Sequence, residues 1–354
     1  MKKLSVVLLT ILTFNSFTYS QGCLPEGITF ATQQQIDDFQ TNYPGCTEIE
    51  GNVEIYSWTD INNLNGLNVL TIIGGDLWIF VNTELIDLTG LNNITSIGGD
   101  LTIADCESLN SLSGLENLSS LGGGLSIHNL ISLNSLAELS NLTAVGGDLQ
   151  IEYNLTLSNL VGLHNITQVN GGLKFAHNNS MINLTGLENL NTIEGELYFM
   201  WNDNLVSLAG IGNIEAASID SLVIVFNPSL SECDVESICN YLASPNAITA
   251  IGFNNNGCNN AFEVQQHCLT GKTVIYSQAE YINIFPNPAK NAVTIICPEE
   301  MDILDFKIYD QTGNLVLHKE STTQSIDIST IQSGLYFVEI ETERAIVRKK
   351  LIIN

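Results

Sequence analysis

The sequence predicts an all-β dominated fold: a right-handed parallel β-solenoid of 24-residue coils with short helical caps, followed by a small antiparallel β-sandwich. Two observations predict the solenoid. An apolar residue returns every 24 positions, and a Gly-Gly-Asp-Leu corner or a near copy follows it. The loss of this period from about residue 281 onward marks a second domain. The recurring apolar residues are Ile73, Ile97, Leu121, Val145, Val169 and Ile193.

Each coil divides into one strand and a series of tight bends. Leu77 and Ile79 alternate with Trp78 and Phe80, which is the period of a strand with one buried face. The two glycines before this strand are expected to supply backbone freedom for a corner. Apolar residues then recur at every third position, which favours tight bends or very short strands over an α-helix. In this coil they are Leu85, Leu88, Leu91, Ile94 and Ile97.

A single coil is too small to fold alone. About seven buried side chains contribute roughly 1.5–3 kcal/mol each, whereas ordering the backbone of one residue costs about 1–2 kcal/mol. We therefore expect the coils to stack, with strands about 4.8 Å apart. A polar column should run beside the strands, its amides bonding to turn backbone and to each other. Its members are Asn82, Asn154, Asn178, Asn202 and Asn227, with Cys106 in the same column as a buried free thiol.

Both ends of the stack are predicted to be capped by a helix and disulfides, because a solenoid exposes an apolar cross-section at each end. Thr32 begins a capping box, and Ile36, Phe39 and Tyr43 form the inner face of the first helix. A second helix is expected around residues 234–242. We expect Cys23 to pair with Cys46, whereas the four later cysteines allow three pairings and Cys297 has no evident mate. The four are Cys233, Cys239, Cys258 and Cys268.

The segment 1–20 reads as a secretory signal peptide, with Lys2 and Lys3 before a short apolar run. Acylation of Cys23 is the alternative, but its preceding residues are not apolar. No later apolar stretch is long enough to form a membrane-spanning helix. Between Gln21 and Leu269, Lys174 is the single basic residue against 27 acidic ones. Such a surface repels phosphate backbones and excludes nucleic acid as a partner.

The outward positions of the strands supply the candidate ligand-binding residues. Positions without a burial role are ordinarily polar, yet several here are large and apolar, which is typical of an interaction surface. The alternative is that the caps or neighbouring loops cover Trp78 and Phe80. The candidates are Tyr56, Trp78, Phe80, His128, Glu152, Lys174, Tyr198 and Met200.

Catalytic residues, cofactors and a metal site are not predicted. Asp76, Asp100 and Asp148 align in one column, where solvated turn residues are favoured over a calcium site. The histidines show no spacing with a nucleophile and base. An enzyme acting on polysaccharide, either a lyase or a hydrolase, stays open as an alternative because some β-helix proteins have these activities.

The segment Leu77-x-Ile79-x-x-Asn82 matches the leucine-rich-repeat core, and the whole unit from Cys23 to Cys268 resembles the receptor L domain. That family is a β-solenoid ligand-binding module, so the resemblance implies binding without naming the ligand. Ligand, oligomeric state and biological role are not predicted.

The C-terminal segment 283–354 resembles the C-terminal sorting domain of type IX secretion. The resemblance implies export across the outer membrane of a Bacteroidota-type cell to the surface or medium, the secretion machinery as a partner, and removal of the domain during attachment. It rests on a Pro-Asn-Pro motif, a Tyr-Asp-x-x-Gly turn, a Gly-Leu-Tyr strand and a basic, apolar terminus. The motif residues are Pro286, Asn287, Pro288, Tyr309, Gly313, Gly334 and Tyr336.

The expected protein is an exported surface protein that binds an extracellular protein or glycan; the alternatives are the polysaccharide enzyme and a purely structural spacer. Its organisation is expected to be a signal peptide (1–20), an N-terminal disulfide cap (21–48), the solenoid (49–230), a C-terminal disulfide cap (231–269), a linker (270–282) and a sorting domain (283–354).

Overall fold

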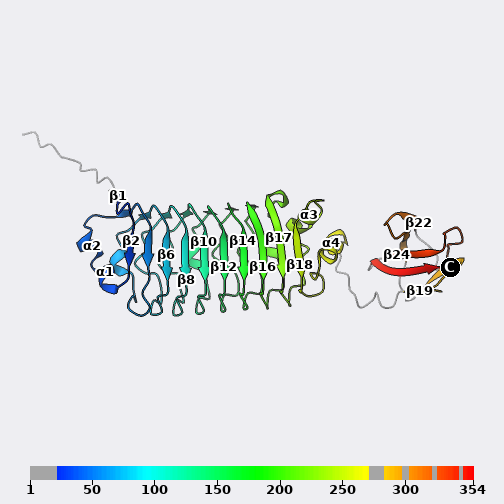
Figure 1. Ribbon diagram of the computed structural model, residues 1–354, viewed down its shortest axis with the longest axis horizontal. Helices are drawn as coiled ribbons and strands as arrows, with labels where there is room; N and C mark the ends of the chain where they lie inside the picture. Colours follow the sequence, from blue (N-terminus) through cyan, green and yellow to red (C-terminus); the bar gives the residue numbers. More distant parts are fainter. Residues whose placement is uncertain (1–21, 271–282, 297–302, 321–324, 343–345) are drawn as a thin grey trace, which may run out of the picture. The chain divides into compact units, whose positions relative to one another are not determined.

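A computed structural model describes residues 22–270, 283–296, 303–320, 325–342 and 346–354. The predicted signal peptide, most of the linker and Cys297 lie outside these ranges. The chain forms two compact units, Met1–Ala261 and Phe262–Asn354. In the first unit, parallel strands stand side by side in one continuous stack (Figure 1).

The main sheet of the stack has ten parallel strands, each paired with the strand of the next coil. Leu101 pairs with Leu125 and Leu125 with Leu149, so the apolar rows superimpose as predicted. All three side chains are fully buried. The strands are β2 (Ile28–Phe30), β4 (Val53–Ile55), β6 (Leu77–Phe80), β8 (Leu101–Ala104), β10 (Leu125–His128), β12 (Leu149–Glu152), β14 (Leu173–Ala176), β16 (Gly195–Met200), β17 (Ile219–Val225) and β18 (Thr249–Gly252).

The segments with apolar residues at every third position form turns, short 3-10 helices and two-residue strands, as the spacing predicted. The short strands build a second parallel sheet of eight members. They are β1 (Gly22–Cys23), β3 (Glu48–Ile49), β5 (Ile72–Ile73), β7 (Ser96–Ile97), β9 (Ser120–Leu121), β11 (Ala144–Val145), β13 (Gln168–Val169) and β15 (Thr192–Ile193). The 3-10 helices are η1 (Asn65–Leu67), η2 (Ala137–Leu139), η3 (Ala209–Ile211) and η4 (Ala216–Ser218).

The corner glycines are required for a reason other than the expected one. Gly98 and Gly122 do not have a positive φ. A Cβ on Gly98 would instead collide with the backbone oxygen of Gly74 in the preceding coil, and a Cβ on Gly122 with that of Gly98. Close approach of successive coils therefore selects glycine here.

The asparagine column forms the predicted hydrogen-bonded ladder. The Oδ1 of Asn178 accepts from the backbone amide of Asn154 at 3.0 Å, and its Nδ2 donates to the carbonyl of Ile151 at 2.7 Å. Asn202 and Asn227 repeat the arrangement further along the stack. These side chains satisfy buried backbone groups that the sheets leave unpaired.

The stack continues beyond residues 49–230 at both ends. β2 adds a strand before the first predicted coil, and β18 adds one after the last. Ile251 of β18 pairs with Ile224, and Asn254 continues the asparagine column by accepting from the amide of Asn227 at 2.9 Å. The period does not reveal β18 because α3 (Glu236–Leu242) intervenes and the Gly-Gly-Asp-Leu corner is missing.

The N-terminal cap is helical but shorter than expected. Thr32 forms the predicted capping box with Gln35 at the start of α1 (Gln33–Asp37), and α2 (Phe39–Asn42) follows. Ile36 and Phe39 are fully buried. Tyr43 was wrongly placed on the inner face: α2 ends at Asn42, and 36% of Tyr43 is exposed.

Disulfides close both ends of the stack. Cys23 pairs with Cys46 as expected, with a Cα–Cα distance of 5.8 Å. At the other end Cys233 pairs with Cys258, which settles a choice that the sequence left open, and Cys239 and Cys268 are both disulfide-bonded. The helix predicted at 234–242 is α3, which buries Ile238 and Leu242. A further helix, α4 (Ala261–Thr270), begins at the boundary between the units.

The second unit contains the predicted antiparallel sheets. One has the order β19-β20-β23 and the other β22-β21-β24-β25, and both contribute buried residues to one apolar core. In the Pro-Asn-Pro motif, the Nδ2 of Asn287 donates to the carbonyl of Lys350 at 2.7 Å, and its Oδ1 accepts from the amide of Ile352 at 2.9 Å. The strands are β19 (Asn283–Phe285), β20 (Ala292–Ile296), β21 (Ile303–Tyr309), β22 (Leu315–Glu320), β23 (Ser325–Asp327), β24 (Gly334–Thr342) and β25 (Ile346–Ile353).

Replacing Asn178 by alanine should destabilise the solenoid strongly. The change leaves the amide of Asn154 and the carbonyl of Ile151 buried without these partners, at a cost of about 1–3 kcal/mol each. Urea unfolding followed by circular dichroism measures the loss. Asn110→Ala, at an exposed position, is the control and should change stability by less than about 0.5 kcal/mol. Equal midpoints for both variants would contradict a structural role for the column.

Candidate binding face

The outward side chains of the main sheet form two straight rows along the stack. Register places Trp78, Lys174 and Tyr198 in the first row. The second row contains Phe80, His128, Glu152 and Met200. The strands between these residues contribute mainly small or polar members: Thr102, Ser126 and Gln150 in the first row, and Ala104 and Ala176 in the second. We call these two rows the binding face.

The structure separates the predicted candidates into two apolar groups. Tyr56 stacks on Phe80 at one end, with ring centroids 5.1 Å apart. Trp78 and Phe80 are half-buried rather than fully covered. Tyr198 and Met200 lie near the other end, and the Tyr198 hydroxyl donates to the Met200 Sδ at 3.0 Å. Five inter-strand steps of about 4.8 Å separate β6 from β16, so the two groups do not form one cluster.

The centre of the face is polar and negatively charged. Lys174 pairs with Asp148, with 3.2 Å between Nζ and Oδ2. Burial favours a higher pKa for Asp148, but the Gly172 amide and Lys174 outweigh it and lower that pKa. Burial and the nearby carboxylates of Glu152 and Glu196 raise the pKa of Tyr198. A cation introduced here would therefore meet several acceptors.

A hollow of about 300 Å³ lies between the two apolar groups. It exists because Gly124 interrupts the aspartate column, so that no side chain fills the space between Asp100 and Asp148. Thr102, Leu125, Ser126 and Gln150 complete its lining.

The aspartate column has a structural role that the sequence interpretation missed. We expected Asp76, Asp100 and Asp148 to be solvated turn residues, and Asp100 is exposed while the other two are half-buried. In addition, Asp76 accepts from the amide of Asp100 at 2.8 Å and Asp148 from that of Gly172 at 2.8 Å, each across one coil. Among the described residues, no group of three or more His, Cys, Asp or Glu side chains is arranged to hold a metal ion.

A second column of half-buried and exposed side chains borders the face. Its residues follow the strands directly and have φ between 52° and 60°, a region that non-glycine residues rarely adopt. We call it the corner column. It consists of Val81, Asp105, Asn129, Tyr153, His177, Trp201, Phe226 and Phe253.

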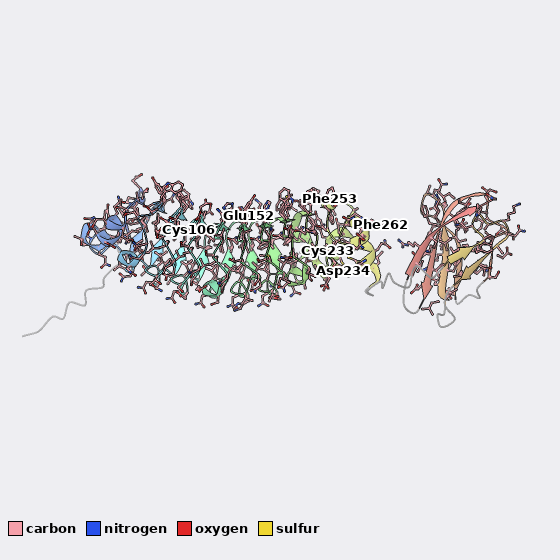
Figure 2. The ribbon with its side chains drawn as sticks, turned by 90° about the horizontal axis from the view of Figure 1, so that it is seen from below. Cys106, Glu152, Cys233, Asp234, Phe253 and Phe262 are labelled. Atoms are coloured by element: carbon pink, nitrogen blue, oxygen red, sulfur yellow. A yellow bond between two sulfur atoms is a disulfide. The ribbon has the colours of Figure 1, made fainter. Side chains whose placement is uncertain are left out.

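The last five members of the corner column are aromatic and form a continuous stack, which we call the aromatic ridge. Centroid distances are 4.3 Å from Tyr153 to His177, 4.6 Å to Trp201, 5.5 Å to Phe226 and 4.6 Å to Phe253. Exposure is 41% for Tyr153, 42% for Trp201 and 70% for Phe253. Glu152, next to the ridge, and Phe253, its last ring, lie along the stack in Figure 2.

The backbone conformation of the ridge residues costs free energy. A left-handed conformation costs an ordinary residue about 1–2 kcal/mol, and asparagine tolerates it better. Asn129 in the same column is such an asparagine in the left-handed conformation, and its Nδ2 donates to Asp105 at 2.7 Å. Aromatic stacking returns about 0.5–1.5 kcal/mol per pair.

The ridge was not among the predicted site residues, because the prediction considered only alternate positions within each strand. The signal was present one residue further on, at the position before the asparagine column. Tyr153, His177 and Trp201 recur there at the same 24-residue interval.

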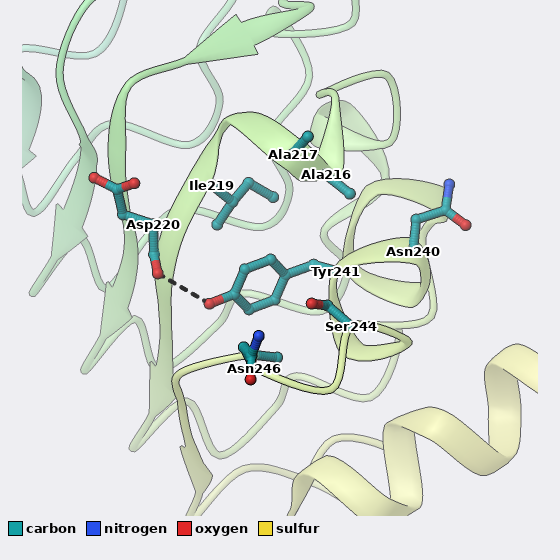
Figure 3. A pocket seen from close by; sticks show the side chains of 9 residues that line it. Ala216, Ala217, Ile219, Asp220, Asn240, Tyr241, Ser244 and Asn246 are labelled. Atoms are coloured by element: carbon teal, nitrogen blue, oxygen red, sulfur yellow. Dashed lines mark hydrogen bonds between the residues drawn. The ribbon is translucent and has the colours of Figure 1, made fainter.

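Another hollow, of about 420 Å³, lies between η4, the start of β17 and α3 (Figure 3). The hydroxyl of Tyr241 points across it and lies 3.1 Å from the carbonyl oxygen of Asp220. The same hydroxyl accepts from the amide of Ile248 at 3.0 Å. These bonds fasten α3 to β17, so this tyrosine has a structural role.

Two comparisons with known proteins agree with this architecture. Residues 141–256 match the receptor L domain family, and residues 283–354 match the secretion system C-terminal sorting domain. In addition, a 76-residue segment is 28% identical to part of Beta-agarase D of Zobellia galactanivorans. That segment covers 21% of this chain and 15% of the agarase, so the chain spans only a small part of that protein.

Fold and matches together describe a parallel β-solenoid that matches the receptor L domain over residues 141–256, followed by a secretion sorting domain at residues 283–354. The C-terminal domain is a sorting domain of the type that marks proteins for type IX secretion, and the protein is exported to the cell surface or extracellular space. None of the helices in the described ranges has the length and apolar character needed to span a bilayer.

The Cys106 thiol is expected to be unreactive in the folded protein. Burial raises its pKa from 9.0 to about 11, against the opposing effect of the Asn82 amide. Between these values the folded state keeps a proton that the unfolded state releases, so stability should fall as pH rises from 9 toward 11. Mass spectrometry after iodoacetamide treatment at pH 8 should find Cys106 unmodified in buffer and alkylated in urea. Rapid alkylation without urea would disprove the assignment.

Proposed function

We propose that this exported protein binds an extracellular protein or glycan through the binding face of its solenoid. The observation that carries the proposal is the placement of large apolar side chains at positions without a burial role. Trp78 and Phe80 stand at one end of the face, and Tyr198 and Met200 stand near the other. The receptor L domain match and the export signal support the same conclusion.

Large apolar side chains remain partly exposed on this face. A strand with one buried face places its alternate residues in solvent, where polar side chains give solubility at no packing cost. Aromatic side chains dominate binding energies once a partner desolvates them. The central rungs, with Thr102, Ser126 and Gln150, leave room for a ligand to lie against the sheet.

A polysaccharide hydrolase is the second candidate, favoured by the agarase likeness and by the central hollow. Asp100 and Asp148 lie two coils apart, which corresponds to about 9.6 Å, near the upper limit for the two carboxylates of an inverting hydrolase. Against this, a general acid needs a raised pKa, and that of Asp148 is lowered. A reducing-sugar assay on agarose and on acidic glycans, with Asp100→Asn as the control, tests the candidate directly.

Changing Trp78, Phe80 and Tyr198 together to serine should remove binding without unfolding the stack. Loss of the aromatic contacts is expected to weaken binding by at least about 30-fold, because interface hot spots contribute about 2 kcal/mol or more each. A glycan and protein array identifies ligands of the intact chain, and surface plasmon resonance then compares the variants.

Trp58→Ser is the matched control for this experiment. Trp58 is 73% exposed but lies in the turn after β4, outside the two outward rows, so its loss should leave affinity unchanged. Unchanged binding by the triple variant would reject the face. An intact chain that retains no ligand on the array would favour a structural spacer.

Maturation should remove the sorting domain in the segment 270–282. This segment lies between the end of α4 and the start of the sorting-domain match at residue 283, and connections between domains are preferred sites of proteolysis. Peptide mapping of protein released from the cell surface should find the chain ending there, whereas protein retained inside the cell keeps its C-terminus. Recovery of peptides from residues 290–354 in the surface fraction would contradict processing at this site.

A further inference from the structure

The aromatic ridge is an apolar surface that the binding face does not need for its own packing. Its rings stand outside the buried column formed by Asn154, Asn178 and their counterparts. Four coil steps carry it from Tyr153 to Phe253, which corresponds to about 19 Å. A helix of about 13 residues has the same length.

The orientation of the rings decides which ligands the ridge suits. Neighbouring rings are stacked, and the four angles between their planes, from Tyr153 to Phe253, are 14°, 30°, 21° and 5°. Each ring therefore covers the face of the next, and only the edges form a continuous exposed surface. Neutral sugars stack on aromatic faces, so along most of the ridge the surface required for them is occupied. Ring edges instead suit apolar side chains and the faces of other aromatic rings.

Charge further restricts the class of partner that the ridge can bind. Glu152 precedes the first ring, Asp203 follows Trp201 by two residues, and both carboxylates lie on a solenoid whose single lysine is paired with Asp148. Acidic glycans and anionic membrane surfaces are repelled by such a protein. A second copy is also unsuited, because the formal net charge of the chain is −27. Electrostatic complementarity favours a partner of opposite charge.

We infer that the aromatic ridge is a docking site for a basic protein segment, whose apolar side chains cover the ring edges while its Lys or Arg side chains meet the flanking carboxylates. This inference rests on the proposed binding function and names the class of its partner. Glu152 belongs to the second outward row and directly precedes Tyr153, the first ring of the ridge, so the partner extends from the ridge toward the binding face.

The test measures binding to the full chain by calorimetry. The probe is a synthetic 18-residue amphipathic helix of leucine and lysine. A peptide with glutamate in place of lysine and a neutral agaro-oligosaccharide are the comparison ligands. The intact chain should bind the lysine peptide at micromolar concentration, and the other two at least 30-fold more weakly.

The decisive variant is Trp201→Asn combined with Phe226→Asn. It removes two rings from the middle of the ridge without changing the net charge, and asparagine is the residue that Asn129 already places in this backbone conformation. Affinity for the lysine peptide should fall at least tenfold, while circular dichroism shows an intact stack. Val81→Asn, in the same column but outside the ridge, is the matched control and should bind like the intact chain.

Each result has one meaning. Equal affinity of the double variant and the intact chain would overturn the inference, because attraction between opposite charges alone would then explain binding. Failure to bind the lysine peptide, or ridge-dependent binding of the oligosaccharide instead, would overturn it as well. The proposed function survives these failures if array ligands still depend on Trp78, Phe80 and Tyr198. Both proposals fail if neither set of substitutions affects any ligand.

Discussion

Superposition of successive coils in register is the constraint on which the solenoid depends. Leu101, Leu125 and Leu149 occupy equivalent positions in neighbouring coils and are completely removed from solvent. One coil cannot bury enough apolar surface to offset the entropy of ordering its backbone. Inter-coil hydrogen bonds and the asparagine column satisfy the polar groups that this burial encloses. The fold therefore requires several stacked coils and does not form in a single coil.

The same constraint creates the candidate site. Equivalent positions of successive coils are brought to about the spacing of neighbouring strands, so any property shared by several coils becomes a row on the surface. Tyr153, His177 and Trp201 are separated in sequence but stack because their strands are adjacent. The acidic side chains recur from coil to coil in the same way, and they give the chain most of its net charge of −27.

The period made most of the solenoid predictable, since a residue repeated at one interval has the same environment in every coil. The inner leucines and the asparagine column were confirmed on this basis, and the Cys23–Cys46 pair, expected from the need to cap the stack, was confirmed as well. β18 was not found because α3 delays it and it keeps only its apolar and asparagine positions. The partner of Cys233 depends on how the cap at the end of the solenoid folds, which spacing alone does not encode.

The candidate site was predicted less completely. Strand alternation identified Trp78, Phe80 and Tyr198, but it says nothing of residues that follow the strand. The aromatic ridge lies at such positions, in a backbone conformation for which propensity predicts Asn or Gly. The hydrogen bonds of the aspartate column were not predicted, because a sequence does not show that an amide of the next coil lies within hydrogen-bonding distance.

The terminal caps touch only the coils beside them, since in a solenoid each repeat contacts its neighbours alone. The number of internal coils is therefore independent of both ends. Duplication or loss of one 24-residue unit would lengthen or shorten the molecule by about 4.8 Å while preserving every other interface. Proteins of this kind can therefore become longer in evolution by duplication of one coil, followed by substitution of the two or three outward-facing side chains of the new coil.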